Sequence, residues 1–165
     1  MSAQVPLDII LKPVGHDPRT AGEWLTNFHM AAVVLDPYTH ESAWILTTAS
    51  RILAHFRGAD CRIVFVVAGT EDEATQFLGP MTDEILTLCD PDRRLVQAAE
   101  LEVLPAFVHI TPSGLVAAKA EGWDPAGWRE VAVALAKRMS WTYPTIPAAT
   151  DPVAYPGTPA VAGAA

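Results

Sequence analysis

The sequence predicts a single α/β domain of three layers, in which helices flank a central mixed sheet of about five strands. Short apolar, β-branched runs alternate along the chain with longer amphipathic segments, the pattern typical of such a sheet. The 165 residues are enough for one domain and few for two, and half of them are hydrophobic. A domain of this size buries about 70% of its unfolded surface, so its core needs no disulfide or metal.

The first part of the chain, residues 1–29, is expected to form an N-terminal extension of this domain. Residues 7–11 predict an irregular strand and residues 20–28 a short helix. The main domain then begins with residues 30–35, a continuous apolar run typical of a strand covered on both faces. The longest helical segment follows over residues 42–56, where apolar side chains recur every three or four positions.

The rest of the main domain, which is expected to span residues 30–141, continues the alternation of strands and helices and ends in a hairpin and a helix. The expected elements are a strand over 62–67, a helix over 70–78, a strand over 85–88, a helix over 95–101, a hairpin over 106–110 and 115–118, and a helix over 125–139. Asp124 and Pro125 suit the N-cap and first position of that last helix.

The composition changes after Trp141. Residues 142–165 are rich in proline and alanine and carry few apolar anchors, so most of this tail is expected to stay disordered and solvated. The part near Tyr143 has enough apolar groups to pack on the domain. A tail that binds a partner is the alternative.

Charge and residue spacing exclude several classes of function. The net charge of −8 repels phosphate backbones, which argues against nucleic acid as a partner. The apolar runs are far shorter than the ~20 residues of a membrane helix, and the N-terminus lacks a signal core, so the cytoplasm is the default location. The five histidines are scattered and form no metal-ligand cluster, and no glycine-rich phosphate loop is present, so neither a metal nor a cofactor is expected.

Three stretches resemble the thioredoxin-like superfamily, above all peroxiredoxins and TlpA-type thiol oxidoreductases. Residues 88–96 are similar to the D-P-D-x-x-L-V/A turn of these families, residues 101–110 to their V-x-x-x-P-T-x-x-x-I segment, and residues 113–122 to their D-G-x-V…G hairpin. Their order and spacing cover about residues 30–139. The resemblance implies a cis Leu104–Pro105 bond, in a loop that faces the helix bearing the active cysteines.

The cysteines of that family are missing where the resemblance places them. The C-x-x-C slot at the start of the long helix is occupied by Thr39 and Ser42, so dithiol exchange by the usual route is excluded. Thr39 suits a helix cap better than a nucleophile. His40 is expected to face solvent, because neighbouring positions on a helix point in different directions.

Only one thiol lies near the implied site. Cys61 begins a strand at the far end of the sheet, whereas Cys89 ends its strand at the same end as Thr39 and Pro105, and a disulfide between the two is not expected. A packed structural thiol is the favoured interpretation of Cys89. Its alternative is a reactive thiolate stabilised by Arg93 and Arg94.

The resulting hypothesis is a thioredoxin-fold protein without dithiol redox activity. It binds a peptide or partner protein in the groove that the resemblance implies beside Pro105, and self-association is a further possibility. The expected binding residues are Tyr38, Thr39, His40, Ser42, Leu104 and Pro105. The alternative hypothesis is a one-cysteine thiol oxidoreductase or peroxidase that uses Cys89.

Overall fold

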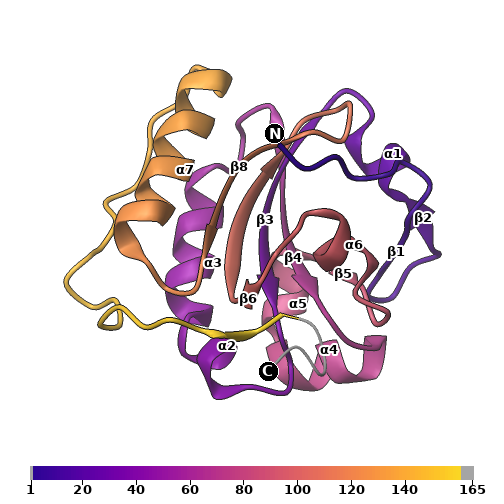
Figure 1. Ribbon diagram of the computed structural model, residues 1–165, viewed down its shortest axis with the longest axis horizontal. Coiled ribbons are helices and arrows are strands. Elements are labelled where there is room, and N and C mark those ends of the chain that lie inside the picture. The colour runs from indigo at the N-terminus through magenta and orange to yellow at the C-terminus, as the bar shows by residue number, and fades with distance from the viewer. Residues whose placement is uncertain (1, 161–165) are drawn as a thin grey trace.

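Seven strands form one mixed sheet in the computed structural model, which describes residues 2–160 (Figure 1). The spatial order is β2-β1-β5-β4-β3-β7-β8, where β3, β4 and β5 are parallel and β7, β8 and β1 run antiparallel to their neighbours. The bounds are β1 Ile10–Pro13, β2 Arg19–Thr20, β3 His29–Leu35, β4 Cys61–Val67, β5 Leu86–Cys89, β7 Ala106–Ile110 and β8 Val116–Glu121.

The three predicted layers are present, but the sheet has seven strands and not about five. The N-terminal extension contributes β1, which overlaps the irregular strand expected over residues 7–11, and β2, which was not expected; β1 pairs with β5 through Lys12 opposite Cys89. These strands are only four and two residues long and are separated by a proline and a glycine turn. Such short runs carry no hydrophobic period, so their pairing could not be seen in the sequence.

Helices cover both faces of the sheet, with α3 and α7 on one face and α1 and α6 on the other (Figure 1). The bounds are α1 Ala21–Leu25, α2 His40–Trp44, α3 Leu46–His55, α4 Glu71–Leu78, α5 Met81–Glu84, α6 Arg94–Ala98 and α7 Pro125–Met139. Strand β3 shows why both faces are apolar. Its side chains alternate between a core containing Phe56 and Trp128 and a core containing Leu25 and Leu95, and Ala31 to Leu35 are almost fully buried.

The helix expected over residues 42–56 is divided. Helix α2 ends and α3 begins at Ile45, whose backbone (φ −91°, ψ −6°) interrupts the ladder of hydrogen bonds. Ile45 is fully buried whereas Trp44 is largely exposed. The break leaves α2 as a separate turn of helix at the carboxyl end of β3.

The C-terminal segment differs most from the prediction. Residues 142–160, called the C-terminal strap here, follow a defined path along α7 and α3 and then cross below the sheet beside α2 (Figure 1). The strap ends in a short strand, β9 (Thr158–Pro159), that pairs antiparallel with β6 (Val103–Leu104). The strap is held mainly by polar contacts and close backbone approaches. The expectation of a disordered tail rested on the small number of apolar residues, which does not reveal such contacts. The rest of the predicted tail, residues 161–165, lies outside the described residues.

Candidate functional site

The loop after β3 uses its hydroxyl groups for structure. Thr39 is the N-cap of α2, and its Oγ1 accepts a hydrogen bond from the Ser42 amide at 3.4 Å. Ser42 is fully buried, and its Oγ accepts the amide hydrogen of Asp36 at 2.9 Å. The Thr39 hydroxyl therefore caps the helix N-terminus, as the cap interpretation requires, and the Ser42 hydroxyl satisfies an amide of the loop before it.

Tyr38 and His40 point away from this buried framework. Tyr38 is 63% exposed and lines a hollow of about 330 Å³ together with Glu73 and Phe77. The Glu73 carboxylate beside it raises the pKa of the Tyr38 phenol above its usual value. His40 is exposed at the start of α2. Neither ring is engaged with the buried hydroxyl of Ser42.

Leu104 and Pro105 form the other side of the predicted site. Both are buried, and the peptide bond between them is cis, as the resemblance implied. The Pro105 carbonyl accepts a hydrogen bond from the Gly122 amide at 2.8 Å, and the two residues before Pro105 form β6, a strand outside the seven-stranded sheet. This strand is the one to which the strap adds strand β9, with Leu104 opposite Thr158 and Val103 opposite Pro159.

Arg93 connects the two sides. Its Nη2 pairs with the buried Asp36 carboxylate at 3.1 Å, and its Nη1 donates to the Ala160 carbonyl of the strap. Asp90 positions this part of the chain, because its carboxylate accepts three amide hydrogens at the start of α6. Burial raises the pKa of Asp90, while those amides act in the opposite direction.

The last part of the strap contacts both sides of the site. The Tyr155 hydroxyl donates to the Glu41 carbonyl in α2, and its ring lies edge-on to Trp44 with 5.5 Å between centroids. Gly157 lies against β6 so closely that an added Cβ would be 2.7 Å from the Leu104 carbonyl oxygen. The Ala160 amide donates to the Glu102 carbonyl at 2.9 Å, and Ala160 is fully buried.

The environments of the two thiols are unfavourable for ionisation. Cys89 is 3% exposed, and burial raises its pKa to about 11, with the Glu71 charge acting in the same direction. Burial and Asp60 likewise raise the pKa of Cys61 to about 11. Arg93 was a candidate to stabilise a Cys89 thiolate, but it is committed to Asp36 and Ala160. The two cysteines lie at opposite ends of β4 and β5, and both are free.

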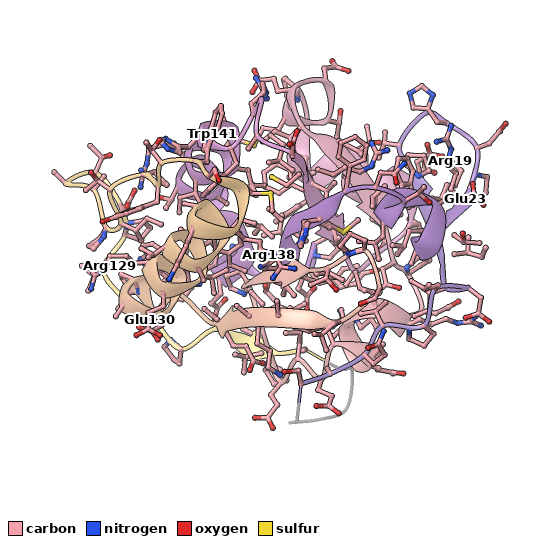
Figure 2. The ribbon with its side chains drawn as sticks, turned by 90° about the horizontal axis from the view of Figure 1, so that it is seen from above. Arg19, Glu23, Arg129, Glu130, Arg138 and Trp141 are labelled. Carbon is pink, nitrogen blue, oxygen red and sulfur yellow. The ribbon has the colours of Figure 1, made fainter. Side chains whose placement is uncertain are left out.

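A second hollow lies at the opposite end of β3. It has a volume of about 450 Å³ and is lined by His109, Lys137 and Arg138, where α7 ends beside β8. Figure 2 shows Arg138 reaching from α7 over the strands. His109 Nε2 lies 2.8 Å from His29 Nδ1, and burial lowers the His109 pKa to about 4. Within residues 2–160 no three His, Cys, Asp or Glu side chains gather as metal ligands, and no helix is long and apolar enough to cross a bilayer.

Comparisons with protein-family models and with curated proteins find no match. Solved structures do match. The bacterioferritin comigratory protein of Xanthomonas campestris, described for alkyl peroxide reduction, has a TM-score of 0.65 and 15% identity, over 84% of this chain and 96% of that one. A putative thiol:disulfide interchange protein DsbE from Chlorobium tepidum has a TM-score of 0.67 and 15% identity, over 84% and 96%.

A third match is a secreted disulfide oxidoreductase of Mycobacterium tuberculosis, with a TM-score of 0.59 and 13% identity, over 79% of this chain and 96% of that one. These similarities establish that the chain has the thioredoxin-like fold, as the sequence predicted. Its neighbours within that fold are peroxiredoxins and thiol:disulfide oxidoreductases.

Sequence reasoning had proposed six residues, and the structure adds others around them. The additional ones are Asp36, Arg93, Glu41, Trp44, Tyr155, Gly157 and Ala160. Three of these belong to the strap, which the composition had indicated to be largely solvated. The available signal was Tyr155-Pro-Gly, an aromatic anchor followed by a glycine in a stretch otherwise poor in apolar residues.

Proposed function

We propose that this protein is a peptide-binding module of the thioredoxin-like fold, which binds an extended segment by strand addition to β6 beside Pro105. The observation that carries the proposal is strand β9. A segment far along the chain lies on this edge through antiparallel backbone pairing, which is how extended peptides are recognised by strand addition. The strap is thus the occupant of the groove within its own molecule.

The chemistry at the α2 N-terminus supports binding over catalysis. Its hydroxyls, on Thr39 and Ser42, are used as caps and backbone acceptors, and Ser42 is buried. The β6 backbone, Trp44 of α2 and Arg93 just before α6 provide the contacts instead, so affinity would come from main-chain hydrogen bonds and specificity from neighbouring side chains.

The test uses the full chain with one change, Gly157→Ala. The added Cβ meets the Leu104 carbonyl oxygen, and φ at Gly157 is +82°, so the segment from Tyr155 to Ala160 should detach while the strap as far as Asp151 stays in place. A fluorescein-labelled, C-terminally amidated peptide of residues 152–160 should then bind the variant more tightly than the unaltered protein, measured by fluorescence polarisation.

Gly79→Ala is the matched control, because Gly79 also has a positive φ (+56°) but has nothing within 4 Å of its Cβ position. It introduces similar backbone strain and leaves β6 covered, so its peptide affinity should equal that of the unaltered protein. The proposal is rejected if Gly157→Ala releases β9, seen as faster amide exchange at Ala160, and the peptide still does not bind.

The comparisons favour a second candidate, a thiol-dependent oxidoreductase or peroxidase. The structural neighbours are redox proteins by name, and analogy alone would place this function first. Cys89 is the thiol at the relevant end of the sheet. Its burial and its raised pKa are opposite to what a nucleophilic thiolate needs, so this candidate requires an opening of the structure around Cys89.

Thiol alkylation across pH 6–10 separates the two candidates. We expect both cysteines to react slowly at pH 7, because a pKa of about 11 leaves little thiolate. Cys61→Ser serves as the control for Cys89→Ser. Rapid reaction at pH 7 that Cys89→Ser abolishes, together with peroxide or disulfide turnover, would establish the thiol enzyme instead.

A further inference from the structure

The docked end of the strap shows which side chains fit the groove beside Pro105. This groove, called the β6 groove here, is bounded by β6, by Trp44 of α2 and by Arg93. Within residues 155–160 the prolines Pro156 and Pro159 are exposed, whereas Tyr155, Gly157 and Ala160 contact the domain. The contacting positions are two and then three residues apart, and the two prolines between them face solvent. Residues 155–160 therefore show which side chains the groove selects, as well as where an extended segment lies.

Tyr155 anchors the start of the segment. Its hydroxyl reaches the Glu41 carbonyl, its ring packs edge-on against Trp44, and its backbone exchanges two hydrogen bonds with Trp123, at 2.9 and 3.1 Å. Phenylalanine would keep the aromatic pair and lose the hydroxyl contact. Aromatic pairs of this geometry add to affinity beyond buried area alone.

Gly157 and Ala160 set limits on size. At Gly157 a Cβ would be 2.7 Å from the Leu104 oxygen and 3.1 Å from the Gly122 Cα, both of which are backbone atoms that cannot move aside easily. Ala160 is fully buried, while its amide and carbonyl are bonded to Glu102 and Arg93. A larger residue at either position would have to displace the backbone.

Thr158 is the one poor fit. Its Oγ1 is the single buried side-chain N or O atom without a hydrogen-bond partner in residues 2–160. A buried hydroxyl left unpaired carries a desolvation penalty that an aliphatic side chain of the same shape does not. The segment thus fits at Tyr155, Gly157 and Ala160 and is weakened at Thr158.

We infer that the β6 groove selects extended protein segments of the pattern Tyr-x-Gly-Val/Ile-x-Ala. The strap competes with such segments for the same groove and binds it more weakly than they do, because it has threonine at the fourth position. This inference rests on the proposed function. The partner is a protein segment with an aliphatic, β-branched residue where this chain has Thr158. A docked strap blocks the groove. The partner's apparent affinity is therefore its intrinsic affinity multiplied by the fraction of molecules whose groove is open.

The experiment measures four peptides against the full-length Gly157→Ala variant, whose groove is released. They are residues 152–160 unaltered and the same peptide with Thr158→Val, Gly157→Ala or Tyr155→Phe. We expect Thr158→Val to bind about tenfold tighter, Gly157→Ala to bind more than tenfold weaker, and Tyr155→Phe to bind a few-fold weaker.

The outcomes distinguish the inference from the proposed function. If no peptide binds the released groove, both fail. If all four peptides bind alike, or if Thr158→Val binds more weakly than the parent, strand addition stands and the selectivity is wrong.

A measurement within the chain keeps the inference testable if the Gly157→Ala variant does not fold. Thr158→Val in the full-length protein should slow amide exchange at Ala160 about tenfold, because the strap docks more firmly. Thr150→Val is the matched control, since Thr150 is exposed in the same strap, and it should leave exchange at Ala160 unchanged. Faster exchange in Thr158→Val than in the unaltered protein would overturn the inference.

Discussion

The two halves of the C-terminal strap are held in different ways. Near its middle, the Asp151 carboxylate is almost completely buried and has three partners, namely Arg51 at 2.8 Å, the Thr48 hydroxyl at 2.9 Å and the Ala148 amide at 2.7 Å. Near its end, β9 is only two residues long and contains the unpaired Thr158 hydroxyl. The buried carboxylate of the first half is fully paired, whereas the second half contains one buried hydroxyl, that of Thr158, without a partner.

This difference explains how a strap can be both part of the fold and an exchangeable ligand. The Asp151 contacts tie the strap to α3, while Arg129 and Trp123 hold the Ile146 and Pro152 carbonyls, at 3.0 and 2.8 Å. Over residues 153–160, Tyr155, Gly157 and Ala160 make the close contacts with the groove, and exposed prolines lie between them. Local opening is expected at the β9 end of the strap, which contains the unpaired hydroxyl. The half anchored at Asp151 then keeps the released segment close to the groove.

The largest effect should come from the anchor. Asp151→Ala removes one carboxylate that serves three partners, so the free energy of unfolding should fall by about 2–3 kcal/mol in urea denaturation. Asp92→Ala is the control, because Asp92 is an exposed aspartate, and should change stability little. Equal stability of the two variants would contradict the distinction between a firm and a weak half.

Arg93→Ala should have an intermediate and local effect. It removes the donor to the Ala160 carbonyl and the partner of the buried Asp36, at a cost of about 1–2 kcal/mol. Amide exchange should become roughly tenfold faster at Ala160 and remain slow at Ala148, whose amide donates to the Asp151 carboxylate of the anchored half. Uniform acceleration along the whole strap would show that its two halves open together.

Alkaline pH should produce the smallest effect and should act only on the weak half. Burial first, and then the Glu41 charge, raise the pKa of Tyr155 above its usual value, because the phenol must stay protonated while it is docked. A raised pKa in the folded state gives a stabilisation that is complete below the unfolded pKa of about 10 and is lost as pH rises through the folded value.

Phenolate absorbance at 295 nm should therefore show a late titration step, which Tyr155→Phe removes. Tyr143→Phe provides the comparison, since Tyr143 is half exposed in the same strap. If the late step attributed to Tyr155 is not seen, the docked half is open already at moderate pH.

The fold was predictable where apolar residues follow a regular period. Strands β3 and β4 are seven-residue runs whose last residues are buried and apolar, and α7 begins at the expected Asp124–Pro125 boundary. The strap was not predictable in this way, because its attachment depends on Asp151, on Arg93 and on close backbone approaches at Gly122 and Gly157. Such contacts join residues far apart in the chain and leave no periodic pattern.

The candidate site was predictable only in part, for a related reason. The capping role of Thr39 follows from its position before a helix, a purely local relation. The pairing of Arg93 with Asp36 and with the Ala160 carbonyl joins three separate segments. It could be found only once the sheet had brought the carboxyl ends of β3 and β5 together.

The packing of Trp44 against Tyr155 also provides an optical reporter. Trp44 is 56% exposed, and the Tyr155 ring is a partner that it has only while the strap is docked. Departure of the segment should shift the emission of this indole, and the difference between the unaltered protein and Trp44→Phe isolates that shift while the buried tryptophans stay in place. The time course of groove opening could then be followed by stopped-flow fluorescence, without any attached dye.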